Sequence, residues 1–459
     1  MSRLSQINWR SVEAEPRSSG TIAAALEHPI ARFVRQTGIP DLHGTTLDKT
    51  VELLRVAAEI EHAFIVQYLY GALSLRQDDP NGNNWYTTLL AIAVEEMGHL
   101  MTVQNLLSLL GQPPYLERQS YPAPASYPFE KTLKCFALGW LGDFVIAESP
   151  ADATFPRGLP PNPNARRVAT YYTYLYWLFK ESEQSSGPWP IPNPHLPVEH
   201  LKDSDFADVA MLMDHIMTPE DWGVAPQPTT QPTVGIQVLA HGPFTTTADA
   251  RDGALNAIYD VAAQGEGPIP QSNSHFDRLS QIYATASTLA QIPLKNVSDN
   301  PHTSPEGGSA PENETGLITH PTARHLAALL NLRYGMLLTE IGLAARIPRS
   351  AVATGVSIKC KLAGWAMDTD MYAIHQLSDL LNAQPLKASR TAPSDLRASP
   401  PFELPGKLPS TEQEGWQFCL DVLDRTKAIV HQIGTAVGGL DSIFEGDDDR
   451  RAFSASRQR

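Results

Sequence analysis

Three side chains that can bind metal ions interrupt apolar helical stripes in the first quarter of the chain: Glu61, Glu96 and His99. The first stripe steps by three and four residues around Glu61 and comprises Val51, Leu54, Ala58, Ile65, Tyr68, Ala72 and Leu75. The second surrounds Glu96 and His99 and comprises Leu89, Ile92, Val103, Leu106 and Leu110. A buried charge is unfavourable unless it is paired or binds a metal. A bundle that takes a Glu from one helix and Glu-x-x-His from its neighbour is typical of carboxylate-bridged iron and manganese sites.

A buried hydrogen-bond network without metal is the alternative interpretation of the same residues. A Glu three residues before a His arises about once by chance in a chain of this length. Glu59 and His62 have this spacing, but their stripe begins at Arg55 and mixes polar with apolar residues. We interpret that pair as a helix flank or an outer support of the site. Metal ligation is the favoured interpretation for Glu61, Glu96 and His99, because they share otherwise apolar stripes.

Charge and composition exclude several classes of partner. The chain has 459 residues, enough for two or three domains, and a net charge of −15, which argues against nucleic acid and anionic membranes. No stretch approaches 18 uninterrupted apolar residues, and the N-terminus lacks the apolar segment of a signal peptide, so we expect a cytoplasmic protein. Cys135, Cys360 and Cys419 are odd in number and widely spaced, and we expect buried free thiols.

Helix signals place the candidate ligands on two neighbouring helices. A capping box at Thr45 and Asp48 predicts a first helix over about residues 45–76. The second helix ends at Gly111, which two prolines follow closely. A Pro-rich crossover over about 112–163 comes next, and its segment FALGWLGDFVIAESP predicts a short strand or an extended layer.

More helices are predicted before the first internal boundary. They cover about 165–184, 203–217, a segment after Thr247 and a segment capped by Ser274. Glu266 and His275 flank an eight-residue loop between the last two of these helices. A helix end followed by a capped helix start can bring both side chains to one point.

Composition divides the chain into five parts. We predict an N-terminal arm over 1–44, a metal-binding domain over 45–295, and a linker or mobile loop over 296–319, which is rich in Pro, Gly, Ser and Asn. A C-terminal helical region over 320–440 contains three helices, near 320–346, 352–383 and 410–437, and a disordered tail follows over 441–459.

The segments EIEHAFIVQYLYGA, AIAVEEMGHLMTVQNLLSLLGQPPYL, FVIAESP, and AIYDVAAQGEG with SHF resemble the ferritin-like domain of iminophenyl-pyruvate dimer synthases. These enzymes couple two amino-acid-derived imines in violacein- and rebeccamycin-type bisindole pathways. The resemblance covers about residues 45–290 and continues weakly to SPPFELP. It implies an all-α fold: a ferritin-like helical bundle with long Pro-rich crossovers, to which the C-terminal helical region is added.

The resemblance also implies a ligand set. Its members are Glu61, Glu96, His99, Glu266 and His275, and Tyr68 would lie beside the site. From the residues alone, Glu266 is equally a solvated helix-end carboxylate, His275 a capping imidazole and Tyr68 a core residue. Related proteins carry a Glu where Thr170 stands here. The site therefore holds either one metal with open positions or two metals in an incomplete cage.

The expected function is that of an iron-dependent oxidoreductase of secondary metabolism. Its substrate would be a small aromatic or amino-acid-derived metabolite, and the reaction imine coupling or oxidation with dioxygen. Imidazole and carboxylate ligands suit one or two Fe²⁺ ions per chain, with manganese as the alternative. Tyr172, with Tyr68, is the candidate catalytic aromatic residue, although an aromatic helix face such as that of Tyr172 is more often simple core. We expect a monomer or homodimer that binds neither nucleic acid nor membrane.

Three other functions fit the same ligands. A metal-binding or storage protein is disfavoured by the chain length and the Pro-rich crossovers, which are better suited to building a pocket. A dimanganese catalase-like enzyme is disfavoured by Thr170, which leaves the two-metal set incomplete. A scaffold subunit with a structural metal site stays open. The sequence does not identify the substrate.

Overall fold

The fold is almost entirely helical, as predicted. The computed structural model describes residues 9–10, 39–118, 132–150, 153–159, 168–182, 189, 199–222, 238–266, 272–305, 310–353, 355–404 and 406–458. Within these residues the strands form two short antiparallel pairs, β1 (Trp9–Arg10) with β2 (Ile39–Pro40) and β3 (Val352–Ala353) with β4 (Val356–Ser357). Helices and their ends therefore carry the groups of the candidate site.

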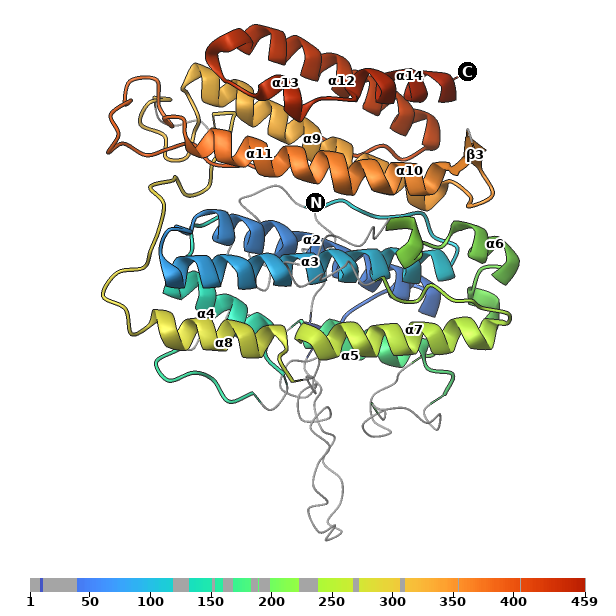
Figure 1. Ribbon diagram of the computed structural model, residues 1–459. Helices are drawn as coiled ribbons and strands as arrows, with labels where there is room; N and C mark the ends of the chain where they lie inside the picture. The colour runs from blue at the N-terminus through green and yellow to red at the C-terminus, as the bar shows by residue number, and fades with distance from the viewer. Residues whose placement is uncertain are drawn as a thin grey trace.

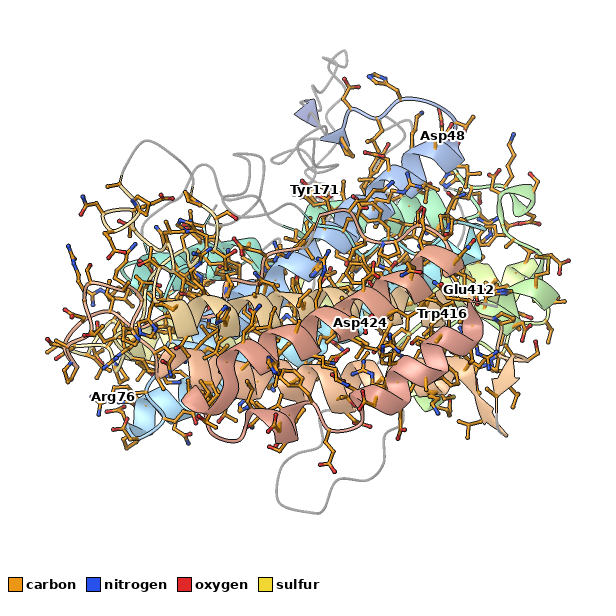
Figure 2. The ribbon with its side chains drawn as sticks, turned by 90° about the horizontal axis from the view of Figure 1, so that it is seen from above. Asp48, Arg76, Tyr171, Glu412, Trp416 and Asp424 are labelled. Carbon is orange, nitrogen blue, oxygen red and sulfur yellow. The ribbon has the colours of Figure 1, made fainter. Side chains whose placement is uncertain are left out.

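Two long helices form the middle layer of the molecule, α2 (Thr46–Leu73) and α3 (Pro80–Leu109). The predicted capping box starts α2: the Thr45 hydroxyl accepts from the Asp48 amide, and the Asp48 carboxylate accepts from the Thr45 amide at 2.9 Å. Asp48 and Arg76 lie at opposite ends of this helix (Figure 2). Asp79 caps α3, and Pro80 occupies its first turn, where no amide donor is needed.

Four helices form the layer on one side of α2 and α3 (Figure 1). They are α4 (Leu138–Ala147), α5 (Ala169–Phe179), α7 (Thr247–Val261), which continues into the π-helix η4 (Ala262–Glu266), and α8 (His275–Ala286). α4 packs on α8 and α5 on α7, while α5 contacts α2, and α7 and α8 contact α3. This layer and the α2–α3 pair make the bundle that encloses the candidate ligands.

The predicted strand in FALGWLGDFVIAESP is wrong, because this segment forms α4. Its buried residues step by three and four along one helical face: Trp140, Leu141, Phe144, Val145 and Ala147. β-branched and aromatic residues favour strands only weakly, and packing against the bundle outweighs that preference. The helix ends directly before Glu148, so α4 determines the position of that residue.

Short helices join α5 to α7 in the described residues. They are η2 (Asp203–Asp205), α6 (Val209–His215) and η3 (Pro219–Trp222), in agreement with the helix predicted near 203–217. Asn105 of α3 holds this connection, since its amide donates to the carbonyls of Met217 at 2.8 Å and Leu239 at 3.0 Å.

The remaining helices form the C-terminal layer, which lies on the other side of α2 and α3 (Figure 1). They are α9 (Pro321–Arg346), α10 (Ile358–Gly364), the π-helix η5 (Trp365–Asp370), α11 (Met371–Asn382), α12 (Glu412–Ile433), η6 (Gly434–Ala436), α13 (Leu440–Ile443) and α14 (Asp447–Arg457). By length and composition α9 could cross a membrane, but 83% of its most apolar stretch is buried in the protein. Its contacts with α11 and α12 account for that apolar character.

The segment 296–319, expected to be a linker or mobile loop, is an ordered connection in its described part. Ser298 and His302 are buried, and the His302 imidazole lies 3.0 Å from the Glu314 carboxylate. The Lys387 ammonium donates to three carbonyls of this connection. Polar groups of this segment thus find partners inside the fold, both within the segment and from Lys387.

The predicted disordered tail is also wrong, because α13 and α14 pack on the C-terminal layer. Arg450 of α14 is only 2% exposed and donates to Asp370 at 2.9 Å and to Glu340 at 2.6 Å. Buried carboxylates on two other helices thus anchor the end of the chain.

A partly enclosed cavity of about 160 Å³ lies between the α2–α3 pair and the C-terminal layer. Its lining is almost wholly apolar and comes from α2, α3, α9, η5 and α11, with Trp222 and Phe402.

Candidate metal centre

One half of the centre comes from α2 and α3. Glu61, Glu96 and His99 are buried and place ligand atoms within 4.8 Å of one another. His99 Nδ1 lies 2.8 Å from Glu96 Oε2 and 3.6 Å from Glu61 Oε2. The apolar stripes fold as predicted, because packing of α2 against α3 turns both stripes towards one interior.

The other half comes from α4 and α8. Glu148 follows the last residue of α4, and His275 is the first residue of α8, after the capping Ser274. His275 Nδ1 lies 2.9 Å from Glu96 Oε1 and 3.5 Å from Glu148 Oε2. Glu96 therefore belongs to both groups, with one carboxylate oxygen facing each imidazole.

Two tyrosines fix the outer oxygens of the flanking carboxylates. The Tyr172 hydroxyl donates to Glu61 Oε1, and the Tyr68 hydroxyl donates to Glu148 Oε1. This leaves the Oε2 atom of each carboxylate for the interior. Tyr68 is itself held by stacking on Phe64, with ring centroids 5.5 Å apart.

Several inward-facing atoms are buried without a partner in hydrogen-bond geometry in the described structure, although Glu96 Oε1 and His275 Nδ1 lie 2.9 Å apart. They are Glu61 Oε2, Glu96 Oε1, Glu148 Oε2 and His275 Nδ1. Unsatisfied buried acceptors are unfavourable, and their convergence on two points is what bound cations require. Two ligand atoms bonded to one ion at about 2.1 Å and roughly 90° lie about 3.0 Å apart. The separations of 2.8 and 2.9 Å between Glu96 and the two imidazoles fit this geometry.

The pKa shifts within the cluster reflect the interactions between its charged groups. Burial raises the pKa of Glu61 to about 8. Burial also acts to raise the pKa of Glu96, but the neighbouring His275 and His99 outweigh it and hold that pKa well below its usual range. Burial lowers and Glu96 raises the pKa of both imidazoles, and the net shift is upward. A cation bound among these carboxylates would take over the stabilising role of the protonated imidazoles.

Different groups support the two imidazoles from behind. His275 Nε2 donates to Glu95 at 2.9 Å, and Arg278 donates to the same carboxylate at 3.0 Å. His99 Nε2 lies 2.8 Å from the amide oxygen of Gln264. When each Nε2 donates outward, each Nδ1 presents its lone pair to the centre, as a metal ligand must.

The charge of this support differs between the halves. Burial acts to raise the pKa of Glu95, but His275 and Arg278 outweigh it and lower the pKa to about 2. Glu95 is therefore an anion behind His275, whereas Gln264 places a neutral amide behind His99.

The π-helix η4 closes one side of the centre. Its Gly265 has no side chain, and a Cβ atom there would lie 2.6 Å from both Glu148 Oε2 and His275 Nδ1. The wider turn also places Gln264 against His99. π-Turns within α-helices are frequent at functional sites.

The structure brings together six of the seven residues chosen from the sequence: Glu61, Glu96, His99, His275, Tyr68 and Tyr172. The backbone of Glu266 ends η4, but its side chain lies outside the described residues. Thr170, where the sequence lacks the carboxylate of related proteins, is a buried hydroxyl on α5. Glu148, which the sequence did not single out, adds a carboxylate to the group of Glu96 and His275.

Sequence reasoning missed Glu148, Glu95 and Gln264. Glu148 lay in the segment interpreted as a strand, although it continues the helical stepping of Leu141 and Phe144. Glu95 and Gln264 carry no pattern that distinguishes them from surface residues.

The other Glu-x-x-His pair, Glu59 and His62, is buried, but its side chains contact residues outside the candidate metal centre. Glu59 accepts from the Tyr115 hydroxyl at 2.7 Å, and His62 contacts the Tyr334 hydroxyl. Among the described residues neither belongs to a group that could hold a metal.

Comparisons with known proteins agree with the helical fold. A family model described as Ferritin-like matches residues 54–284. The chain is similar to dichlorochromopyrrolate synthase of Lentzea aerocolonigenes, with 25% identity over 408 residues, covering 79% of this chain and 36% of that enzyme. The chain thus spans about a third of the length of this curated relative. No solved structure matches the chain. The two matches confirm the resemblance from which the fold was predicted.

Proposed function

The chain belongs to the ferritin-like family, and we propose that it is an oxidoreductase with two iron ions that acts on a small, aromatic, amino-acid-derived metabolite. The sharing of Glu96 between two buried groups carries this proposal. One group is Glu61, Glu96 and His99, and the other is Glu96, Glu148 and His275. Three carboxylates and two imidazoles form a donor set that suits iron, with manganese as the alternative.

Each group would hold one ion, with Glu96 bridging the two. When bound, such ions supply electron transfer between an organic substrate and dioxygen. Glu148 supports two ions rather than one, because it gives the second group a third side chain that could bind an ion.

The residues around the ligands have separate tasks. Tyr172 and Tyr68 orient Glu61 and Glu148, and each phenol–carboxylate contact can hold a proton beside the centre. Glu95 and Gln264 orient the imidazoles. Trp140 and Phe144, which pack on Tyr68, keep water from that side of the site.

The substrate class rests on the relative. Its name describes the synthesis of a dichlorinated chromopyrrolate, and the class of aromatic, amino-acid-derived substrate comes from the resemblance to iminophenyl-pyruvate dimer synthases. Coupling and oxidation of an aromatic α-imino acid are the two reactions proposed for this chain. Because the chain spans about a third of that enzyme's length, the reaction of the whole relative is not transferred to it.

Metal stoichiometry tests the site. Protein loaded with Fe(II) under anaerobic conditions should hold two ions per chain by elemental analysis. Glu148→Gln should hold one, and Glu96→Ala none. Glu59→Gln, which changes a buried carboxylate outside the centre, should keep two. Absence of metal from the wild-type protein would leave the cluster as a hydrogen-bond network and remove the proposed function.

Turnover tests the reaction class. Aromatic α-imino acids generated from their amino acids should be consumed by the iron-loaded protein under air, and mass spectrometry should detect a dimer or an oxidised monomer. Glu96→Ala should produce neither. Consumption at the same rate by wild type and Glu96→Ala would contradict a role for the centre.

A dimanganese enzyme that disproportionates peroxide is the second candidate. Thr170 counted against it in the sequence, and Glu148 removes that objection by completing a two-metal ligand set. Manganese-loaded protein that evolves dioxygen from peroxide, while iron-loaded protein leaves imino acids unchanged, would favour this candidate.

A further inference from the structure

The apolar cavity between the layers is separate from the metal centre. The centre lies where α2 and α3 face α4 and α8, whereas the cavity lies where the same two helices face α9 and α11. Residues of both long helices line it, including Leu69 of α2 and Leu100 of α3. Leu337 and Ile374 form part of the opposite wall. No ligand of the centre borders the cavity.

The cavity presents almost no polar surface to a ligand. The Tyr334 hydroxyl in its lining contacts His62 Nε2 and accepts from Arg118 Nε at 3.0 Å, while His62 Nδ1 and the Trp222 indole nitrogen have no hydrogen-bond partner in the described structure. The Ser378 hydroxyl, also in the lining, donates to the carbonyl of Ile374 at 2.7 Å. A charged or strongly polar ligand would lose hydration there without replacement.

One edge of the cavity reaches the surface. Tyr86 is half-buried and His375 is exposed, and the Tyr86 hydroxyl lies 3.4 Å from His375 Nε2. This contact joins α3 to α11 across the cavity edge. A small molecule can therefore enter at this edge when the two side chains change rotamer.

The size and lining of the cavity identify the class of ligand. A cavity of about 150 Å³ with apolar walls holds one benzene molecule, and the present volume is about 160 Å³. A fused bisindole skeleton is too large for this space. Thioether sulfur contacts aromatic rings favourably and adapts to their shape, and the lining includes Met97, Met101, Met367 and Met371.

We propose that the cavity between α2–α3 and α9–α11 is a second binding site, which takes an uncharged apolar molecule of the size of one or two fused aromatic rings. It is independent of the metal centre and goes beyond the proposed function. Binding places the ring between the two layers of the molecule, so the ligand stabilises their packing.

Thermal unfolding and saturation-transfer NMR with toluene and indole test this site. Both ligands should raise the melting temperature of the wild-type protein by several degrees and show saturable transfer. Metal-free protein should respond equally, which separates this test from that of the metal centre. Tryptophan should produce no shift, because the almost wholly apolar lining cannot replace the hydration of its ammonium and carboxylate groups.

Val66→Phe and Val352→Phe are a matched pair of variants. Val66 is buried in the cavity lining, so the larger ring should fill the space and abolish the ligand-induced shift. Val352 is 56% exposed on β3, and its variant should respond as the wild type does. Equal shifts in both variants would place the ligand elsewhere and overturn the proposal.

A second variant covers the case in which Val66→Phe does not fold. Leu337→Ala enlarges the cavity, and it should bind naphthalene more tightly than the wild type by at least tenfold. If neither toluene nor indole shifts the wild type and Leu337→Ala gains no affinity for naphthalene, the cavity is not a binding site.

Discussion

Glu96 directs one carboxylate oxygen to each imidazole of the centre, at 2.8 Å from His99 Nδ1 and 2.9 Å from His275 Nδ1. Each imidazole also has a flanking carboxylate, Glu61 or Glu148, whose outer oxygen is held by a tyrosine. The two halves therefore repeat one another in ligand type and distance. The halves differ in the groups that contact the outer nitrogens of the imidazoles: the carboxylate of Glu95 is charged, whereas the amide of Gln264 is neutral.

Removing the charge of Glu95 should weaken metal binding at one half of the centre and not at the other. We expect Glu95→Gln to lower metal affinity at the His275 half by about 10- to 100-fold, because an anionic partner makes the imidazole a stronger donor. By the same reasoning, Gln264→Glu should raise metal affinity at the His99 half. Stepwise Fe(II) titration against a chromophoric chelator measures the two affinities. Equal weakening of both steps in Glu95→Gln would contradict the assignment of Glu95 to one half.

At the residue scale the sequence predicts ligands that interrupt a regular pattern. Glu61, Glu96 and His99 could be found because their neighbours on the helix are apolar. Glu148 could not, since its role depends on whether the preceding residues form a strand or a helix, which packing decides. The partner of His275 was beyond prediction for another reason: Glu95 meets it across a sequence separation of 180 residues.

At the scale of elements, the π-helix η4 combines two functions in one turn. It brings Gln264 to His99 and presents the bare backbone of Gly265 to the second half of the centre. A regular α-helical turn would place these residues at a different angle around the helix axis. The sequence predicted a helix end here but not its change of pitch.

Gly265→Ala should damage the second half without unfolding the protein. The added Cβ atom would lie 2.6 Å from Glu148 Oε2 and His275 Nδ1, so one of these ligands must move. We expect one iron per chain in place of two, with an unchanged circular dichroism spectrum. Gly139→Ala is the control, since a Cβ on this α4 glycine meets nothing within 4 Å. Two irons in Gly265→Ala would show that the ligands tolerate the displacement.

Lys359 on α10 should make stability depend on pH. Its ammonium donates to the carbonyls of His215 at 2.7 Å and Ala344 at 2.6 Å, and burial lowers its pKa to about 8. Between about pH 8 and 10.5 the unfolded chain binds a proton that the native protein has released, so stability rises with pH in this window. Below about pH 8 both states hold the proton, and this contribution is constant.

Comparison with Lys359→Met isolates that contribution. The free energy of unfolding of the wild type minus that of the variant should increase by up to about 3 kcal/mol between pH 8 and 10.5, at about 1.4 kcal/mol per pKa unit. Urea unfolding at several pH values measures it. A difference that stays flat, or falls, over this window would mean that the native ammonium keeps its ordinary pKa.

At the scale of the whole molecule, buried ion pairs attach the C-terminus to the C-terminal layer. Arg450 of α14 lies between Asp370 of η5 and Glu340 of α9, and Arg333 donates to Asp370 at 3.1 Å. These partners are distant in sequence: Arg450 is separated from Asp370 by 80 residues and from Glu340 by 110. Breaking a buried pair is strongly destabilising, because the remaining charges lose their compensation.

Arg450→Ala should therefore lower the free energy of unfolding by about 3–5 kcal/mol. Arg451→Ala, which removes an exposed pair with Asp424, should leave the urea midpoint unchanged. Metal content should be the same in both folded variants, because α14 does not touch the centre. A small effect of Arg450→Ala would show that α14 contributes little to the packing of the layer.

Composition predicted the large-scale organisation less well than the site. The acidic run in EGDDDRRAFSASRQR indicated disorder, but Arg450 within it finds buried carboxylates on other helices. Likewise, the polar segment near His302 is held by side chains such as Lys387, which is distant in sequence. A sequence shows which groups are polar, but not which partners the fold brings to them.

Helix α2 lies between the metal centre and the cavity, and every residue from 56 to 68 is buried. Solvent can reach its amides only if one of the two layers separates from it. Amide hydrogens in this stretch should then exchange with water at rates set by global unfolding, while those at the surface of α14 exchange through local opening. The segment that carries Glu61 is therefore the part of the scaffold that local fluctuations disturb least.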